Sequence, residues 1–151
     1  MDAIAVGSKI LETAENEVVW LAPRLSLVFT LQYSIIEKSK VCIESGVCVR
    51  GIVDFSYPYI NIIQQLLDAG QDVRHFDKYQ GIFMVVADKK SISTISVNAE
   101  SLSLDTPVIA LWSDDPTYAE YLMSTFEIAW EQSVPAAQRI EELLKEEPPQ
   151  V

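Results

Sequence analysis

The chain has 151 residues, about half of them apolar, which is enough for one domain with its own core and too few for two. Its 22 acidic and 11 basic residues give a formal net charge of -11, which repels nucleic-acid phosphates and disfavours direct nucleic-acid binding. No apolar run reaches the length of about eighteen residues that a membrane helix needs, and the first residues lack the pattern of a signal peptide. We therefore expect a cytoplasmic protein, or a cytoplasmic piece of a longer one, with no membrane contact.

The chain has few cysteines and histidines, the usual ligands of structural zinc. Cys42 and Cys48 are its two cysteines, and His75 is its single histidine. This spacing does not match the paired ligands of a zinc site. We expect two reduced, buried thiols, no metal and no cofactor.

Helices and strands alternate through the first half of the chain. Apolar periodicity, prolines and helix-ending glycines set the boundaries. The first helix is also a segment that can continue from an upstream module in a longer protein. In order, the pattern predicts a helix over residues 2–15, a strand over 18–22, a long helix over 26–45 with Leu27, Leu31, Ile35 and Ile36 as its stripe, a strand over 47–53, a helix from Ile60 to the stop at Gly70, and a short strand over 72–76 that suits a sheet edge.

A hairpin follows these elements. Residues 82–87 are an unbroken apolar run, and residues 92–97 alternate apolar residues with Ser and Thr. A turn centred on Asp88 and Lys89 joins the two strands. This register places Gly81 opposite Ser96 and Phe83 near Thr94.

The last third of the chain returns to helices. Asp115 and Pro116 are a typical helix start, because they supply a capping oxygen and a proline in the first turn. The pattern predicts a connector over residues 99–105, a strand over 107–112, a helix with an aromatic-rich core stripe of Tyr118, Leu122, Phe126 and Trp130, a helix that restarts after Ser133 and Pro135 and buries Ile140, Leu143 and Leu144, and a tail over residues 148–151.

This order of elements predicts the fold class. Strands alternating with helices, then a hairpin, a strand and two helices, give an α/β fold with a mixed central sheet flanked by helices. We expect a single domain over residues 1–147.

The hairpin resembles the signature of the phospholipase D superfamily, H-x-K-x4-D-x6-G-S-x-N. In that family the histidine becomes phosphorylated during the reaction and the lysine holds a phosphate. The spacing matches without a gap: Asp88, Ser96 and Asn98 stand at the aspartate, serine and asparagine positions, whereas Gly81, Phe83 and Ile95 replace the histidine, lysine and glycine. The layout of the chain also resembles a phospholipase D half-domain, down to Phe126 and Trp130 in the helix after the last strand.

The resemblance implies a non-catalytic member of this superfamily. Phosphodiester cleavage needs a nucleophilic imidazole and cationic groups, and Gly81 and Phe83 supply neither. The domain is similar to the effector-sensing domains of archaeal TrmB-like transcription regulators, which implies a sensor or regulatory module in a transcription or signalling protein. Such a module binds a small-molecule effector, mediates dimerisation, or does both, and is attached to an output domain; we expect a homodimer.

Two other functions stay open at this point. One is a divergent phosphodiesterase or nuclease that uses His75 with Asp88 and Asn98. The other is an interaction module in which Phe83 fills the hairpin face and serves only to pair subunits. For Asp88 a purely structural role in the turn is the simpler account.

Candidate ligand-binding residues come from two places. Ligands of open α/β sheets sit beyond the carboxyl ends of strands, where Arg24 is the only cation. On the hairpin, side chains of equal parity share a face and line a vestigial pocket, or are buried and bonded to each other. The candidates are Arg24, Asp54, Tyr57, Tyr59, Phe83, Ser96, Asn98 and Trp112.

Overall fold

The computed structural model describes residues 3–27, 30–31, 33–78, 82–96 and 108–146. In this part of the chain the strands form one seven-stranded sheet in the order β6-β5-β4-β1-β2-β3-β7. The first three strands run parallel, and every other neighbouring pair is antiparallel. The predicted mixed sheet is therefore confirmed. The strands are β1 (Glu17–Ala22), β2 (Cys48–Val53), β3 (Asp72–His75), β4 (Ile82–Ala87), β5 (Lys90–Ser96), β6 (Val108–Ser113) and β7 (Val134–Pro135).

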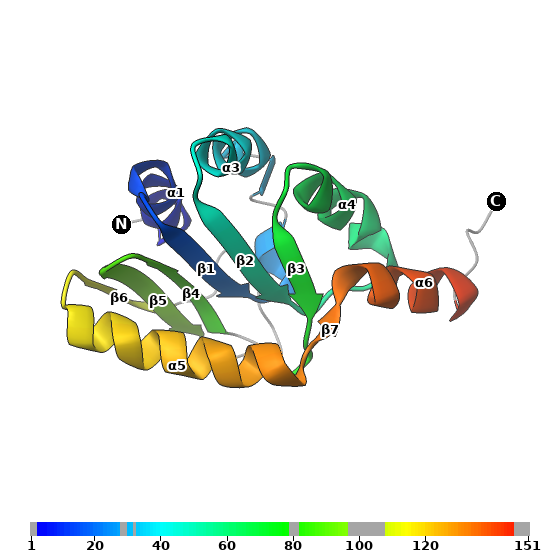
Figure 1. The fold of residues 1–151 in the computed structure, drawn as a ribbon. Coiled ribbons are helices and arrows are strands. Elements are labelled where there is room, and N and C mark those ends of the chain that lie inside the picture. The colour runs from blue at the N-terminus through cyan, green and yellow to red at the C-terminus, as the bar shows by residue number, and fades with distance from the viewer. Residues whose placement is uncertain (1–2, 28–29, 32, 79–81, 97–107, 147–151) are drawn as a thin grey trace.

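Helices cover both faces of this sheet (Figure 1). Three of them, α1, α3 and α4, lie over one face, while α5 runs along the other and α6 follows β7. This arrangement confirms the predicted α/β class. The predicted connector over residues 99–105 and the tail over residues 148–151 lie outside the described residues. The helices are α1 (Ala3–Thr13), α3 (Ile35–Glu44), α4 (Ile60–Asp68), α5 (Pro116–Gln132) and α6 (Ala136–Glu146), with two short 3-10 helices, η1 (Arg24–Leu27) and η2 (Tyr57–Tyr59).

β1 contributes to two apolar clusters, because successive side chains of a strand point to opposite faces. Val18 packs with Ile10 of α1 on one face. Val19 and Leu21 pack with Phe126 of α5 on the other. A strand buried on both faces needs apolar residues at every position, which is why this strand is a continuous apolar run.

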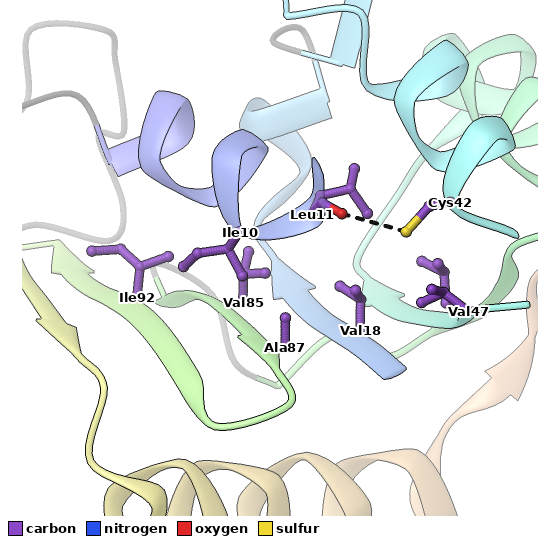
Figure 2. Packing of buried hydrophobic residues seen from close by; sticks show 9 residues of the cluster. Ile10, Leu11, Val18, Cys42, Val47, Val85, Ala87 and Ile92 are labelled. Carbon is purple, nitrogen blue, oxygen red and sulfur yellow. Dashed lines mark hydrogen bonds between the residues drawn. The ribbon is translucent and has the colours of Figure 1, made fainter. Parts of the chain in front are cut away.

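Figure 2 shows the cluster on the α1 side of the sheet. Ile10 of α1 points down to the strands, Leu11 lies on the side of α1 that faces α3, and the Cys42 thiol of α3 donates to the Leu11 carbonyl at 3.3 Å. Burial, and after it the negative charge of Asp88, raises the pKa of Cys42. Cys42 is the buried thiol that the sequence predicts. The same prediction for Cys48 was wrong, because this residue begins β2 at the rim of the sheet and is exposed.

The hairpin has the predicted turn and register. Asp88 and Lys89 form the turn, and Phe83 pairs with Thr94. Asp88 takes a left-handed backbone conformation with φ of 56°, which Asp tolerates better than most residues. Gly81, predicted to extend this register, lies outside the described residues.

The long helix predicted over residues 26–45 was wrong. η1 ends at Leu27, and α3 begins only at Ile35. Between them Ser34 has φ of 54° and ψ of 38°, a left-handed conformation that interrupts a right-handed helix. As a result Leu31, which the predicted stripe placed in the core, is exposed.

β3 is not at the edge of the sheet, contrary to the prediction. The two-residue strand β7, which the sequence pattern did not indicate, pairs with Arg74 and His75 of β3. In α6, which follows β7, Ile140 and Leu143 are buried as predicted. Leu144 is exposed, because one residue further along a helix turns the side chain away from the sheet.

Two arginines hold α5 against the sheet. The Arg50 guanidinium lies 5.1 Å from the ring centroids of both Phe126 and Trp130, and it donates a 2.5 Å hydrogen bond to Glu127. That hydrogen bond, which outweighs the effect of burial, raises the pKa of Arg50. Arg74 lies 4.7 Å from the ring centroid of Trp130. Cation–π contacts of this kind are worth roughly 0.5–2 kcal/mol each, so the aromatic stripe of α5 is part of the core, as predicted.

Gly51 of β2 lets a large side chain from the neighbouring strand lie flat on the sheet. Trp20 of β1 pairs with Gly51, and a Cβ atom added at Gly51 would overlap the indole ring. The indole Nε1–H donates to Oε1 of Gln71 at 2.8 Å, which fixes the orientation of the ring.

Replacing Gly51 by alanine tests this packing. The added methyl group must push Trp20 away from its hydrogen bond with Gln71, so we expect Gly51→Ala to lower the free energy of unfolding by about 1–3 kcal/mol. Urea denaturation measures the change. Val41→Ala, at an exposed position of α3, is the control and should stay within about 0.5 kcal/mol of the wild type. A Gly51→Ala variant as stable as the control would contradict the prediction.

Candidate functional site

Phe83, at the lysine position of the signature, lines an apolar cavity between the sheet and the helices on the α1 side. The cavity has a volume of about 80 Å³ and is bounded by side chains of β1, β2 and β4 and of α1, η1, α3 and α4. Phe83 packs closely on α1, because a Cβ added at Gly7 would lie 3.4 Å from its ring. The lining residues are Gly7, Ser8, Leu11, Val18, Trp20, Ala22, Ser26, Leu27, Thr30, Ile35, Val49, Leu66, Gln71, Phe83 and Val85.

The polar groups of this lining mostly bond to other protein groups. Gln71 accepts from the Trp20 indole at 2.8 Å, and the Ser8 hydroxyl accepts from the Lys38 ammonium at 2.6 Å. The Ser26 hydroxyl donates to a backbone carbonyl at 2.7 Å. With these groups engaged, the cavity presents an apolar surface to whatever occupies it.

A second cluster lies at the carboxyl ends of the parallel strands. Arg24, after β1, donates a 2.7 Å hydrogen bond to Asp54, after β2. The other carboxylate oxygen of Asp54 is 3.9 Å from Nδ1 of His75, at the end of β3. The sequence correctly placed Arg24 and Asp54 at the same edge. Since the guanidinium and the carboxylate already pair with each other, much of the charge of Arg24 is neutralised within the protein.

His75 is held in its neutral form. Its Nδ1 accepts a hydrogen bond from the Phe55 backbone N–H at 3.3 Å, which requires this nitrogen to be unprotonated. Burial, together with the positive charge of Arg139, lowers the pKa of His75 and outweighs the opposite effect of nearby carboxylates. The Phe55 ring packs edge-on against the imidazole with a centroid separation of 5.4 Å. These contacts account for His75 as a packed residue at a strand end.

The aromatic candidates do not all gather at this edge. Tyr57 and Tyr59 form η2, a few residues after Asp54, and both are half-buried. Trp112 does not approach Arg24, because β6 runs antiparallel to β1 and two strands separate them. The rule that carboxyl ends share one edge holds for parallel strands only.

The hairpin candidates are described in part. Phe83 lines the cavity. The backbone of Ser96 ends β5 opposite Val108 of β6, and its side chain lies outside the described residues, as does Asn98. Their roles stay a prediction.

Asp88 fastens the hairpin turn to the loop between α1 and β1. Its carboxylate accepts hydrogen bonds from the backbone N–H groups of Glu15, Asn16 and Glu17 at 3.0–3.2 Å. Burial acts to raise the pKa of Asp88, but these hydrogen bonds outweigh it and lower the pKa below the ordinary value. The structural role that the sequence favoured is confirmed for this residue. His75 lies at the opposite end of the strands, so Asp88 is not its partner.

Sequence reasoning missed the main wall of the cavity. Trp20 and Val85 look like ordinary strand residues, and Gln71 looks like a loop residue. One signal was available in Gly7: a glycine inside a helix costs stability and often marks a close contact. That contact is the one with Phe83.

The described residues contain no group of three or more His, Cys, Asp or Glu side chains placed to hold a metal ion. None of the helices in the described segments is long and apolar enough to cross a membrane.

Comparison with protein-family models and with curated proteins finds no match. Among solved structures, the chain is similar to TrmBL2, an archaeal chromatin protein, with a TM-score of 0.66 and 16% identity over 87% of this chain and 50% of that one. It is also similar to NucT from Helicobacter pylori, with a TM-score of 0.64 and 16% identity over 89% of this chain and 91% of that one. The fold is phospholipase D-like.

The similarity of fold bears on how the hairpin compares with the phospholipase D signature. The expected half-domain architecture is confirmed, and the chain spans half the length of TrmBL2. Within this fold, the signature's lysine position carries an aromatic ring against an apolar cavity.

Changing Asp88 to asparagine tests how the turn is anchored. The variant loses the charge that three backbone N–H groups stabilise, so we expect the free energy of unfolding at neutral pH to fall by about 1 kcal/mol, limited by the exposure of the site. The unfolded pKa is 3.8 and the folded pKa is lower. The wild-type advantage is therefore complete above 3.8 and is lost as the pH falls through the folded pKa.

Denaturation with urea at a series of pH values measures this difference. Asp114→Asn removes a negative charge from an exposed position and is the control. A difference between wild type and Asp88→Asn that does not shrink in acid would contradict the prediction.

Proposed function

We propose that this domain is a non-catalytic, phospholipase D-like sensor that binds a small apolar molecule in the cavity beside Phe83. The observation that carries the proposal is the position of Phe83. It stands where the signature has its phosphate-holding lysine, and its ring lines an apolar cavity. An apolar cavity at this position suits a hydrocarbon or an aromatic ring and offers no cation to a phosphate.

Three features of the residues support the absence of phosphodiester chemistry. Gly81 has no side chain that can act as a nucleophile, and Phe83 has no charge to stabilise a phosphoryl group. Nδ1 of His75 accepts a hydrogen bond from the Phe55 backbone N–H, so the proton of the neutral ring is on Nε2 and neither nitrogen has a free lone pair for nucleophilic attack. His75 and Asp88 lie at opposite ends of the strands, so these two residues of the rival hypothesis are not partners.

The volume of the cavity limits which classes of ligand can bind. A volume of about 80 Å³ is well below the range of about 300–1,000 Å³ that pockets for drug-sized ligands occupy. Sugars and nucleotides are larger, and they need free polar partners that this lining does not offer. We therefore propose a small, mostly apolar metabolite, in place of the polar effector that the strand-end residues suggest.

Residues of α1 in the cavity wall connect ligand binding to the packing of this helix. α1 contributes Gly7, Ser8 and Leu11, so an occupant touches the first helix of the domain. TrmBL2 is an archaeal chromatin protein with a novel mode of DNA binding, and this chain matches half of it. We propose that the domain is joined to an output domain and that occupancy changes the packing of α1. Because this domain is acidic and repels phosphates, we assign any nucleic-acid contact to the output domain.

A thermal-shift screen tests the ligand site. A small apolar compound that binds only the folded state at about 100 times its dissociation constant adds about 2.7 kcal/mol, which corresponds to roughly 5–10 °C in Tm. Ala22 is a buried lining residue, and Ala22→Leu fills the cavity with a larger side chain. We expect this variant to lose most of the shift.

Ala137→Leu makes the same substitution at an exposed position of α6 and should keep the full shift. If Ala22→Leu does not fold, Phe83→Ala provides a second test, because a wider cavity should accept larger aromatic compounds than the wild type. A shift that Ala22→Leu retains, or one given only by sugars and nucleotides, would overturn the apolar site.

A phosphodiesterase assay separates the proposal from its enzymatic rival. We expect the wild type to cleave bis(p-nitrophenyl) phosphate no faster than buffer alone. The variant His75→Ala should be indistinguishable from it. Turnover that disappears in His75→Ala would establish the rival function instead.

A further inference from the structure

The outer edge of β6 is open and apolar. β6 pairs with β5 on one side, and in the order of the described sheet no strand lies on its other side. Ile109 is 70% exposed and Leu111 is 50% exposed, and Trp112 is exposed as well. An edge of this kind presents unpaired backbone N–H and C=O groups together with apolar side chains, which is a template for another strand.

The apolar surface extends from β6 onto α5. Ser93 of β5 pairs with Leu111, and its hydroxyl is 3.4 Å from the hydroxyl of Tyr118 in α5. Tyr118 in turn stacks on Tyr121, which is exposed. Three of the eight large hydrophobic residues that the described chain exposes, Ile109, Leu111 and Tyr121, therefore lie at this corner, and Trp112 is exposed on the opposite face of β6, because its partner Ile92 packs on the α1 side. Patches of this kind mark interaction sites more often than scattered exposed residues do.

The two edges of the sheet differ in how they are protected. The opposite edge is β7, which is two residues long and ends in Pro135, so it offers little to a new strand. β6 has six residues, Val108–Ser113, with no proline, glycine or charged residue among them. Features that prevent pairing with another strand are therefore present at the β7 edge and absent from β6.

We propose that β6 is a dimerisation surface whose partner is β6 of a second copy of this chain. The chain carries a net charge of -11, and the uncharged strand is a place where two such copies meet without bringing like charges into contact. The pairing is antiparallel about a two-fold axis normal to the sheet, so that the two sheets become one. This inference is independent of the ligand in the cavity.

The strand is complementary to itself in such a pair. With the axis at Ala110, Ile109 of one copy lies opposite Leu111 of the other, on the face that carries α5. These apolar pairs add to roughly four to six backbone hydrogen bonds, because this register pairs residues 108–112 of the two strands. In the resulting continuous sheet, Tyr121 of each copy lies beside the β6–β6 junction, and the exposed apolar residues of β6 become covered.

Light scattering coupled to size-exclusion chromatography tests the dimer. We expect the wild type to have twice the chain mass, and Leu111→Lys to raise the dissociation constant roughly tenfold or more. Leu144→Lys is the matched control, because Leu144 on α6 is 49% exposed and Leu111 is 50% exposed. A monomeric wild type, as expected if β6 binds only a strand of another protein, would overturn the proposal. So would a dimer that Leu111→Lys leaves intact.

Cross-linking tests the register and does not depend on the stability of Leu111→Lys. Directly opposed residues of an antiparallel pair have Cα atoms about 4.5–5.5 Å apart, within reach of a disulfide. In a Cys48→Ser background, which removes the exposed native thiol, Ala110→Cys should form a covalent dimer under mild oxidation. Ala137→Cys, exposed on α6, should stay monomeric on denaturing gels. Equal cross-linking of the two variants would overturn the paired edge.

Discussion

The packing of Trp20 over Gly51 determines the shape of the functional side of the sheet. An indole ring laid across a neighbouring strand needs a position without a side chain, and Gly51 provides it. The hydrogen bond from Nε1 to Gln71 then keeps the ring in place, with its polar atom satisfied although it is half-buried. Because Trp20 forms part of the cavity wall, the same contact that holds β1 and β2 together also defines the candidate ligand site.

The geometry of the hairpin turn depends on other residues than those at the histidine and lysine positions of the signature. Asp88 accepts three backbone N–H groups and fixes the turn to the start of β1. None of these contacts involves the positions of the missing histidine and lysine. The phenyl ring of Phe83 lets β4 pack on Gly7 of α1, where a lysine would have to leave its charge in an apolar environment.

Local patterns predicted the parts of the fold that local interactions decide. The turn at Asp88 sets the register of β4 and β5, and the Asp115 cap sets the start of α5, so both were predictable. The break at Ser34 was not, since its left-handed conformation depends on tertiary packing and serine gives no warning of it. The cavity could not be predicted from the sequence, also because it depends on tertiary packing. It is bounded by side chains from elements far apart in the chain, and sequence alone does not place them together.

The prediction that Trp112 lies at the same sheet edge as Arg24 was wrong, and the reason is the direction of the strands. Trp112 was grouped with Arg24 on the assumption that every strand points the same way, whereas three strands on one side of β1 alternate in direction. The parallel half therefore gathers polar groups at one edge, where Arg24 and Asp54 neutralise each other. The antiparallel half instead extends the sheet sideways to β6, and two strands separate that edge from β1. Because Phe83 of β4, in this antiparallel half, lines the cavity, a second copy joined at β6 would continue the same sheet that borders the cavity, and ligand and partner would contact one sheet.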